Sequence, residues 1–235
     1  MNALTQISNV HICQDRPLAS VWQSKQASFA HLPCATVPFS TQAIGTFFPN
    51  TKAVTMKANN LQKAGELIRL KRGLYVISPK ESGETLSTEL IANHIYGPSY
   101  VSLQTALRFY GLIPEAVHEI QSMTIKRARL FTNDLGVFNY ISCPRDYFSI
   151  GIRQITINNN TLLIATPEKA LCDTLCYTPN LNIRYKKELS ILLEDNWRFD
   201  MDVLQQMNTD IIEQCAAVGK KQTTLLQLLK LIRHE

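Results

Sequence analysis

The 235-residue chain has the composition of an ordinary soluble globular protein, with 45% hydrophobic and 18% charged residues. No apolar run approaches the roughly 18 residues of a membrane span, and the first residues lack the basic-then-apolar pattern of a secretion signal. We therefore expect a cytoplasmic protein that does not contact a membrane. Its length suffices for one large or two small domains with a real hydrophobic core.

The net charge of +5 is unevenly distributed along the sequence. Residues 1–80 hold nine Lys and Arg against two acidic residues, a net charge of +7, whereas residues 81–235 hold fifteen against seventeen, a net charge of −2. Local positive charge favours nucleic acids, because binding releases their condensed counterions. The asymmetry predicts two domains, 1–80 and 84–235, joined by a Pro-, Ser- and Gly-containing linker over 78–83.

The start of the chain has a weak pattern, and residues 1–39 are interpreted as an N-terminal extension. Within it, residues 18–29 are compatible with a short helix. A clearer helix is predicted over 40–48, because this segment follows Pro38, is stopped by Pro49 and offers Ser40 as its cap.

A second helix is predicted directly after Pro49. Asn50 or Thr51 would cap it, and Gly65 would end it in a left-handed conformation. Its apolar positions recur at helical spacing and predict a buried stripe: Val54, Ala58 and Leu61. The opposite face is polar and basic.

A basic β-hairpin follows this helix, with strands over 67–70 and 74–77 and a tip at 71–73. The order of helix, glycine and basic hairpin is typical of a winged helix-turn-helix, in which the helix enters the major groove and the wing contacts phosphates. The candidate base-contacting residues are Lys52, Thr55, Met56 and Asn59. The candidate phosphate contacts are Lys57, Lys63, Arg69, Lys71 and Arg72. The alternative is a winged fold of purely structural role with a solvated hairpin.

The rest of the sequence predicts a mixed domain. Helices are expected over 86–96 and 103–110, then strands over 120–126, 129–132, 137–141, 152–157 and 161–164. Thr166-Pro167-Glu168 is a strong helix start, with a hydroxyl cap, a proline and an acid at the positive helix end. Further helices are expected over 185–193, 201–207, 211–218 and 223–232. The predicted fold class is α+β: an N-terminal winged helix-turn-helix, then a mixed α/β domain with antiparallel hairpins and a helical tail.

Several segments of this sequence resemble AbiEi-type antitoxins of type IV toxin–antitoxin, or abortive infection, systems. They are Arg72-Gly73-Leu74-Tyr75, Pro98-Ser99-Tyr100-Val101-Ser102-Leu103, Ala106-Leu107, Tyr110-Gly111-Leu112-Ile113-Pro114-Glu115, and Ala165-Thr166-Pro167-Glu168-Lys169-Ala170-Leu171 with Asp173. The resemblance covers about residues 40–177. The first 39 residues depart from the commoner form of the family, which starts close to its first helix.

The resemblance implies an antitoxin whose winged domain binds repeats in its own promoter in double-stranded DNA and represses transcription. It also implies that the second domain counteracts a cognate nucleotidyltransferase-like toxin without a stable complex. The alternative is a stand-alone winged-helix transcriptional regulator whose second domain senses a ligand or a partner.

No pattern in the sequence supports an enzyme, a metal site or a bound cofactor. The five histidines form no spaced pair, and there is neither a phosphate-binding Gly-rich loop nor a serine nucleophile motif. The six cysteines lack zinc spacing, so we expect buried free thiols of a reducing compartment. Asp173 lies among apolar helix residues and is interpreted as a buried, hydrogen-bonded structural carboxylate in preference to a catalytic one.

A second basic cluster, Lys126, Arg127 and Arg129, falls on a predicted strand or its turn. One interpretation is a solvated edge strand, where basic side chains discourage aggregation. The other is a contact surface for DNA, RNA or an acidic partner.

Overall fold

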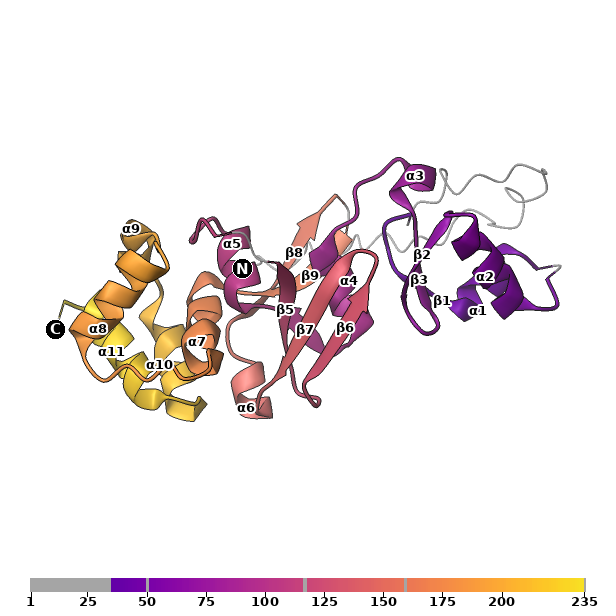
Figure 1. Cartoon of the computed structure of the whole chain (residues 1–235). Coiled ribbons are helices and arrows are strands. Elements are labelled where there is room, and N and C mark those ends of the chain that lie inside the picture. Colours follow the sequence, from indigo (N-terminus) through magenta and orange to yellow (C-terminus); the bar gives the residue numbers. More distant parts are fainter. Residues whose placement is uncertain (1–34, 50, 116–117, 159, 235) are drawn as a thin grey trace, which may run out of the picture.

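The computed structural model describes residues 35–49, 51–115, 118–158 and 160–234 (Figure 1). It is a mixed α+β structure, as predicted, with a three-stranded and a six-stranded sheet in the described part of the chain. No described helix combines the length and the apolar character needed to cross a bilayer. The helix suggested over 18–29 lies outside the described residues.

Five elements form the N-terminal unit: β1 (Phe39–Ser40), α1 (Thr41–Phe47), α2 (Val54–Lys63), β2 (Leu67–Lys71) and β3 (Leu74–Ile77). The strands pair antiparallel in the order β1-β3-β2. The predicted apolar stripe of α2 is confirmed, because Ala58 and Leu61 are buried and Val54 packs against the same small core. This core places the opposite face of α2 toward solvent.

The predicted cap of α2 is wrong at Thr51, and Asn50 lies outside the described residues. The helix begins at Val54, and Ala53 occupies the capping position without a side-chain acceptor. The backbone N–H of Thr51 donates to the carbonyl of Phe48 at 3.0 Å, which closes a turn after α1. The residues before Val54 are therefore used to redirect the chain between the two helices.

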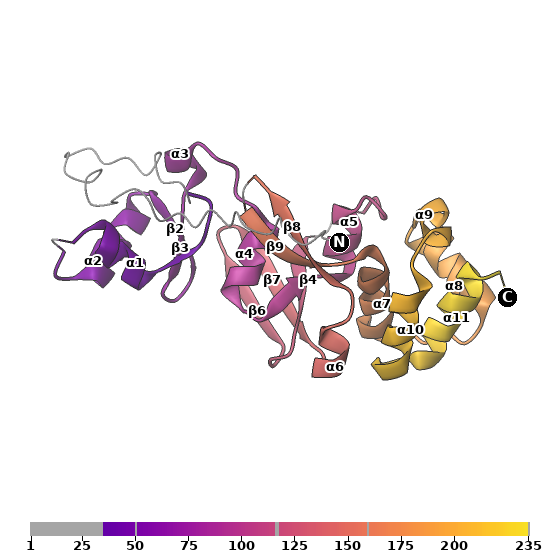
Figure 2. The same cartoon turned by 180° about the vertical axis from the view of Figure 1, so that it is seen from behind.

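The hairpin β2–β3 buries residues on both of its faces. Tyr75 and Ile77 pack in the small core beside α2, whereas Leu70 and Val76 belong to the main core. Successive strand residues point to opposite faces, so alternation alone produces this division. The hairpin lies between the N-terminal helices and the larger sheet in both views (Figures 1 and 2).

The larger sheet has the strand order β6-β7-β5-β4-β9-β8. Its strands are β4 (Ser99–Val101), β5 (Glu119–Thr124), β6 (Arg129–Asn133), β7 (Gly136–Ser142), β8 (Ile152–Ile157) and β9 (Asn160–Ala165). The expected antiparallel hairpins β6–β7 and β8–β9 are present, and β4–β9 and β5–β7 are parallel pairs. The sequence did not predict β4, because three residues after a proline are too few to show a period.

Helices cover both faces of this sheet. The Tyr140 hydroxyl of β7 donates to the Ala92 carbonyl of α4 (Thr88–Ile95), whereas the Tyr100 hydroxyl of β4 donates to Asp173 of α7 (Pro167–Tyr177). Strand register places these two tyrosines on opposite faces. Beside α7 lie α5 (Leu103–Phe109) and the short α6 (Arg145–Phe148).

The C-terminal part is helical, as predicted (Figure 2). It comprises α8 (Lys186–Ile191), a π-helical turn (Leu192–Asn196), α9 (Met201–Gln205), α10 (Thr209–Val218) and α11 (Gln222–Ile232). The segment 78–83, predicted as a linker, instead contains a single helical turn, α3 (Pro79–Ser82). Pro79 begins this turn and Gly83 ends it with a φ of +70°.

One glycine in the helical tail has no room for a side chain. A Cβ on Gly219 would lie 2.4 Å from the Cys215 carbonyl oxygen and 2.7 Å from the Tyr147 ring. We expect Gly219→Ala to lower the free energy of unfolding by about 1–3 kcal/mol through overpacking. Gly45→Ala is the matched control, because it fills ordinary space inside α1 and should stabilise the protein by about 0.5–1 kcal/mol. Urea unfolding of both variants checks the opposite signs.

Candidate nucleic-acid interface

The outer face of α2 is polar, basic and open to solvent. Thr55, Met56, Asn59 and Lys63 are all exposed, and Met56 keeps 64% of its surface accessible. Lys52 is also exposed but lies in the connection before the helix, not on the helix itself. No acidic residue occurs in α2. These five candidate residues therefore form one surface, called here the α2 face.

Lys57 differs from the other lysines of this helix. It is half-buried, and its Nζ lies 4.5 Å from the centroid of the Phe48 ring in the connection between α1 and α2. A cation over an aromatic face is an attractive arrangement. Lys57 is thus held against the start of the helix-to-helix connection, beside the α2 face.

The basic residues of the hairpin point in different directions. Arg69 is exposed on β2, whereas the Lys71 Nζ donates to the Ile95 carbonyl at the end of α4. The Asn133 side-chain amide of β6 donates to the Leu70 carbonyl at 3.1 Å. The tip of the hairpin is therefore attached to the larger sheet rather than standing free as a wing tip.

This attachment brings the hairpin tip next to the second basic cluster. A pocket of about 510 Å³ lies between them, and its lining comprises Lys71, Arg72, Tyr96, Gly97, Lys126, Arg129 and Phe131. We call it the cationic pocket. Arg127 is exposed and is not part of the lining, but its carbonyl accepts a hydrogen bond from the Tyr96 hydroxyl. Of the candidate residues, the structure thus joins Lys71, Arg72, Lys126 and Arg129.

The charges in the cationic pocket influence one another. Burial, followed by the nearby charges of Lys126 and Arg129, lowers the pKa of Lys71. Like charges disfavour protonation of a neighbouring amine. The sequence showed two separate basic clusters, and no local signal indicated that a contact between residues about sixty positions apart would merge them.

A buried polar cluster lies beneath the larger sheet, and it contains Asp173. The Lys169 Nζ lies 3.1 Å from Asp173 Oδ1, and both side chains are fully buried. The Ser102 hydroxyl donates to Asp173 Oδ2 at 2.6 Å, and the Tyr100 hydroxyl does so at 3.1 Å. Burial, followed by the Asp173 charge, raises the pKa of Tyr100 far above its usual value. The prediction of a buried, hydrogen-bonded carboxylate is confirmed.

The Ser102 side chain does not cap α5 but bonds to Asp173. Ser102 precedes α5 as a capping residue would, but its side chain makes no cap hydrogen bond. Its hydroxyl is used by Asp173 instead. Thr166, by contrast, caps α7 through a bond from the Lys169 backbone N–H, as predicted.

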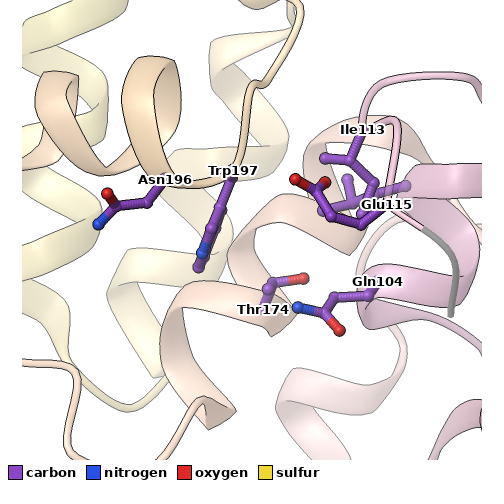
Figure 3. Close-up of a pocket in the computed structure, with 7 residues that line it drawn as sticks. Gln104, Ile113, Glu115, Thr174, Asn196 and Trp197 are labelled. Atoms are coloured by element: carbon purple, nitrogen blue, oxygen red, sulfur yellow. The ribbon is translucent and has the colours of Figure 1, made fainter. Parts of the chain in front are cut away.

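A smaller pocket of about 150 Å³ lies between α5, α7 and the π-helical turn (Figure 3). Gln104 and Thr174 line one side, and Trp197 lies across from Glu115. The volume is that of a benzene-sized cavity. None of the residues predicted to contact DNA lines it.

The cysteines that the structure describes are buried and free, as expected. Cys143, Cys172, Cys176 and Cys215 are buried free thiols, whereas Cys13 and Cys34 lie outside the described residues. Burial raises the pKa of Cys143 to about 12, so this thiol is protonated at neutral pH. Within the described ranges, no group of three or more His, Cys, Asp or Glu residues is arranged to hold a metal ion.

Compared with known proteins, the chain matches no family model and no curated protein.

Proposed function

We propose that this protein binds double-stranded DNA through a winged helix-turn-helix formed by α1, α2 and the β2–β3 hairpin, and that it regulates its own promoter. The observation that carries the proposal is the α2 face: exposed side chains able to contact bases lie beside lysines on a helix that contains no acid. A recognition helix needs this combination, because phosphate contacts position the protein and base contacts discriminate between sequences.

The individual side chains of the α2 face suit the major groove. The side-chain amide of an asparagine such as Asn59 can bond an adenine edge through both its oxygen and its NH2 group. An exposed apolar side chain such as Met56 can contact a thymine methyl. Lys63, in the last turn of the helix, suits a phosphate. For the residues of α2, these roles are the DNA contacts predicted from the sequence. For Lys71, the hydrogen bond to the end of α4 favours a role at the junction of hairpin and sheet over a phosphate contact.

We further propose that the protein acts as an AbiEi-type antitoxin, with residues 84–235 counteracting a nucleotidyltransferase-like toxin. The motifs quoted above support this part of the proposal. Two of them meet in the buried cluster, where Tyr100 and Ser102 bond to Asp173. The alternative, a regulator whose second domain senses a ligand, is favoured by the cationic pocket at the junction with the hairpin.

A salt-series binding titration with the protein's own promoter tests DNA binding. Asn59→Ala should weaken promoter binding by about 1–3 kcal/mol, roughly 5- to 150-fold, and leave scrambled DNA unaffected. Lys63→Ala should weaken both DNAs equally and reduce the salt slope by about one. Fluorescence anisotropy at four or more salt concentrations provides both quantities.

Lys187→Ala is the matched control for Lys63→Ala, because Lys187 is an exposed lysine on the distant helix α8. It should change neither affinity nor salt slope. Equal affinity of the wild-type protein for promoter and scrambled DNA would contradict specific recognition by α2. Unchanged binding in both α2 variants would move the DNA contact elsewhere on the protein.

A further inference from the structure

The cationic pocket gathers positive charge without a neutralising partner. Its lining holds four cationic side chains and no carboxylate. Among the described residues, the ion pairs are Lys169–Asp173 and Arg233–Glu213, neither of which touches this pocket. The Arg72 guanidinium is exposed and has no hydrogen-bond partner in the described part of the chain. The lining therefore favours an anionic ligand.

Three of the four cations contact other parts of the protein, among them Lys71, whose Nζ donates to the Ile95 carbonyl. The Lys126 Nζ donates to the Gly97 carbonyl and lies 5.3 Å from the centroid of the Tyr96 ring. The Arg129 guanidinium lies 4.8 Å from the centroid of the Phe131 ring. Side chains fixed in this way lose little freedom when a ligand binds. Together with burial, which is the larger cause, repulsion from Lys126 and Arg129 lowers the pKa of Lys71, and an anion that enters the pocket relieves this repulsion.

We propose that the cationic pocket binds a small molecule of nucleotide size that carries at least two phosphate groups. Two arginines and two lysines match several negative charges, and the guanidinium fork is well suited to phosphate oxygens. The volume of about 510 Å³ lies within the usual range of small-molecule sites and leaves room beyond a bare pyrophosphate. A single exposed basic strand edge would not offer cations from two parts of the chain.

The location of the site gives it a regulatory consequence. Lys71 and Arg72 come from the β2–β3 hairpin, whereas Lys126 and Arg129 come from the larger sheet and the turn before it. A bound polyphosphate joins these two parts and occupies Arg72, a candidate DNA contact. This consequence rests on the proposed function: at constant ionic strength, the ligand should weaken DNA binding by the wild-type protein.

Calorimetric titration of the full-length protein with inorganic pyrophosphate and with ATP tests the site directly, in metal-free buffer of fixed ionic strength and without DNA. Saturable one-to-one binding is expected. Arg129→Gln and, separately, Lys126→Gln should each weaken it roughly ten- to hundredfold, as expected for loss of a charged hydrogen bond. Thermal unfolding without ligand establishes that each variant is folded.

Arg153→Gln is the matched control. Arg153 also lies on an edge strand, β8, and its guanidinium lies 5.1 Å from the centroid of the Tyr110 ring, but it is at the opposite edge of the sheet. It should bind both ligands as the wild type does. Absence of saturable binding, equal affinity in the Arg129→Gln variant, or an equal loss in the Arg153→Gln variant would each overturn the proposal.

A final arm distinguishes a free ligand from the DNA backbone as the source of phosphate. A short duplex without promoter repeats is titrated into the same variants. If Arg129→Gln weakens only the duplex and pyrophosphate does not bind, the pocket is part of the DNA surface and the small-molecule proposal fails. Because the ligand titration contains no DNA, it can succeed even if promoter binding by α2 is not found.

Discussion

Asp173→Asn is expected to lower the free energy of unfolding by about 3–5 kcal/mol, although it only replaces one carboxylate oxygen by an NH2 group. The asparagine oxygen can still accept from the hydroxyls of Ser102 and Tyr100. Its NH2 group then replaces the oxygen that faces the Lys169 ammonium, so the charge and one acceptor are lost together. Lys169 would then be a fully buried ammonium whose remaining polar neighbours are the Tyr147 carbonyl and the Cys215 sulfur. Urea unfolding followed by circular dichroism measures the difference.

The double variant Lys169→Met with Asp173→Asn is the decisive control. Removing the second charge should recover more than half of the lost stability, because an uncompensated buried charge costs more than a neutral pair. A loss below about 1 kcal/mol in Asp173→Asn would mean that the ion pair contributes little. No recovery in the double variant would place the cost in the packing of the altered side chains.

The local features of this fold could be predicted because their physical causes lie within a few residues. The stripe of Val54, Ala58 and Leu61 follows from helical period, and the Thr166 cap follows from the need to satisfy free N–H groups. The hairpins β6–β7 and β8–β9 follow from alternation and a short turn. Each prediction required only neighbouring residues.

The features that could not be predicted depend on distant partners. Thr51 has the chemistry of a cap, yet its backbone N–H closes the turn after α1 and the helix begins three residues later, at Val54. Ser102 has the same chemistry, yet Asp173, 71 residues away, takes its hydroxyl. The position of Lys71 at a hairpin tip predicts a phosphate contact. Its place beside Lys126 follows only from the contacts of that hairpin with α4 and β6 in the folded protein.

Ala58→Glu is expected to abolish the proposed DNA binding while leaving the proposed toxin neutralisation intact. Ala58 lies on α2 and is fully buried in the small core. A carboxylate there has neither space nor a partner, which should cost roughly 3 to 5 kcal/mol and open the N-terminal unit. Amide hydrogen exchange should accelerate over residues 41–77. Ala217→Glu, the same change on the exposed side of α10, should alter neither exchange nor DNA binding.

The same variant separates the two roles proposed for the chain. When the protein is co-expressed with a nucleotidyltransferase-like toxin, the partner that the proposed antitoxin activity requires, cells carrying Ala58→Glu should grow as well as cells carrying the wild type. The hairpin makes this a demanding test, because Leu70 and Val76 are embedded in the main core. If exchange accelerates equally over residues 99–176 and neutralisation is lost, the two cores unfold together. The separate assignment of DNA binding and antitoxin activity would then have to be abandoned.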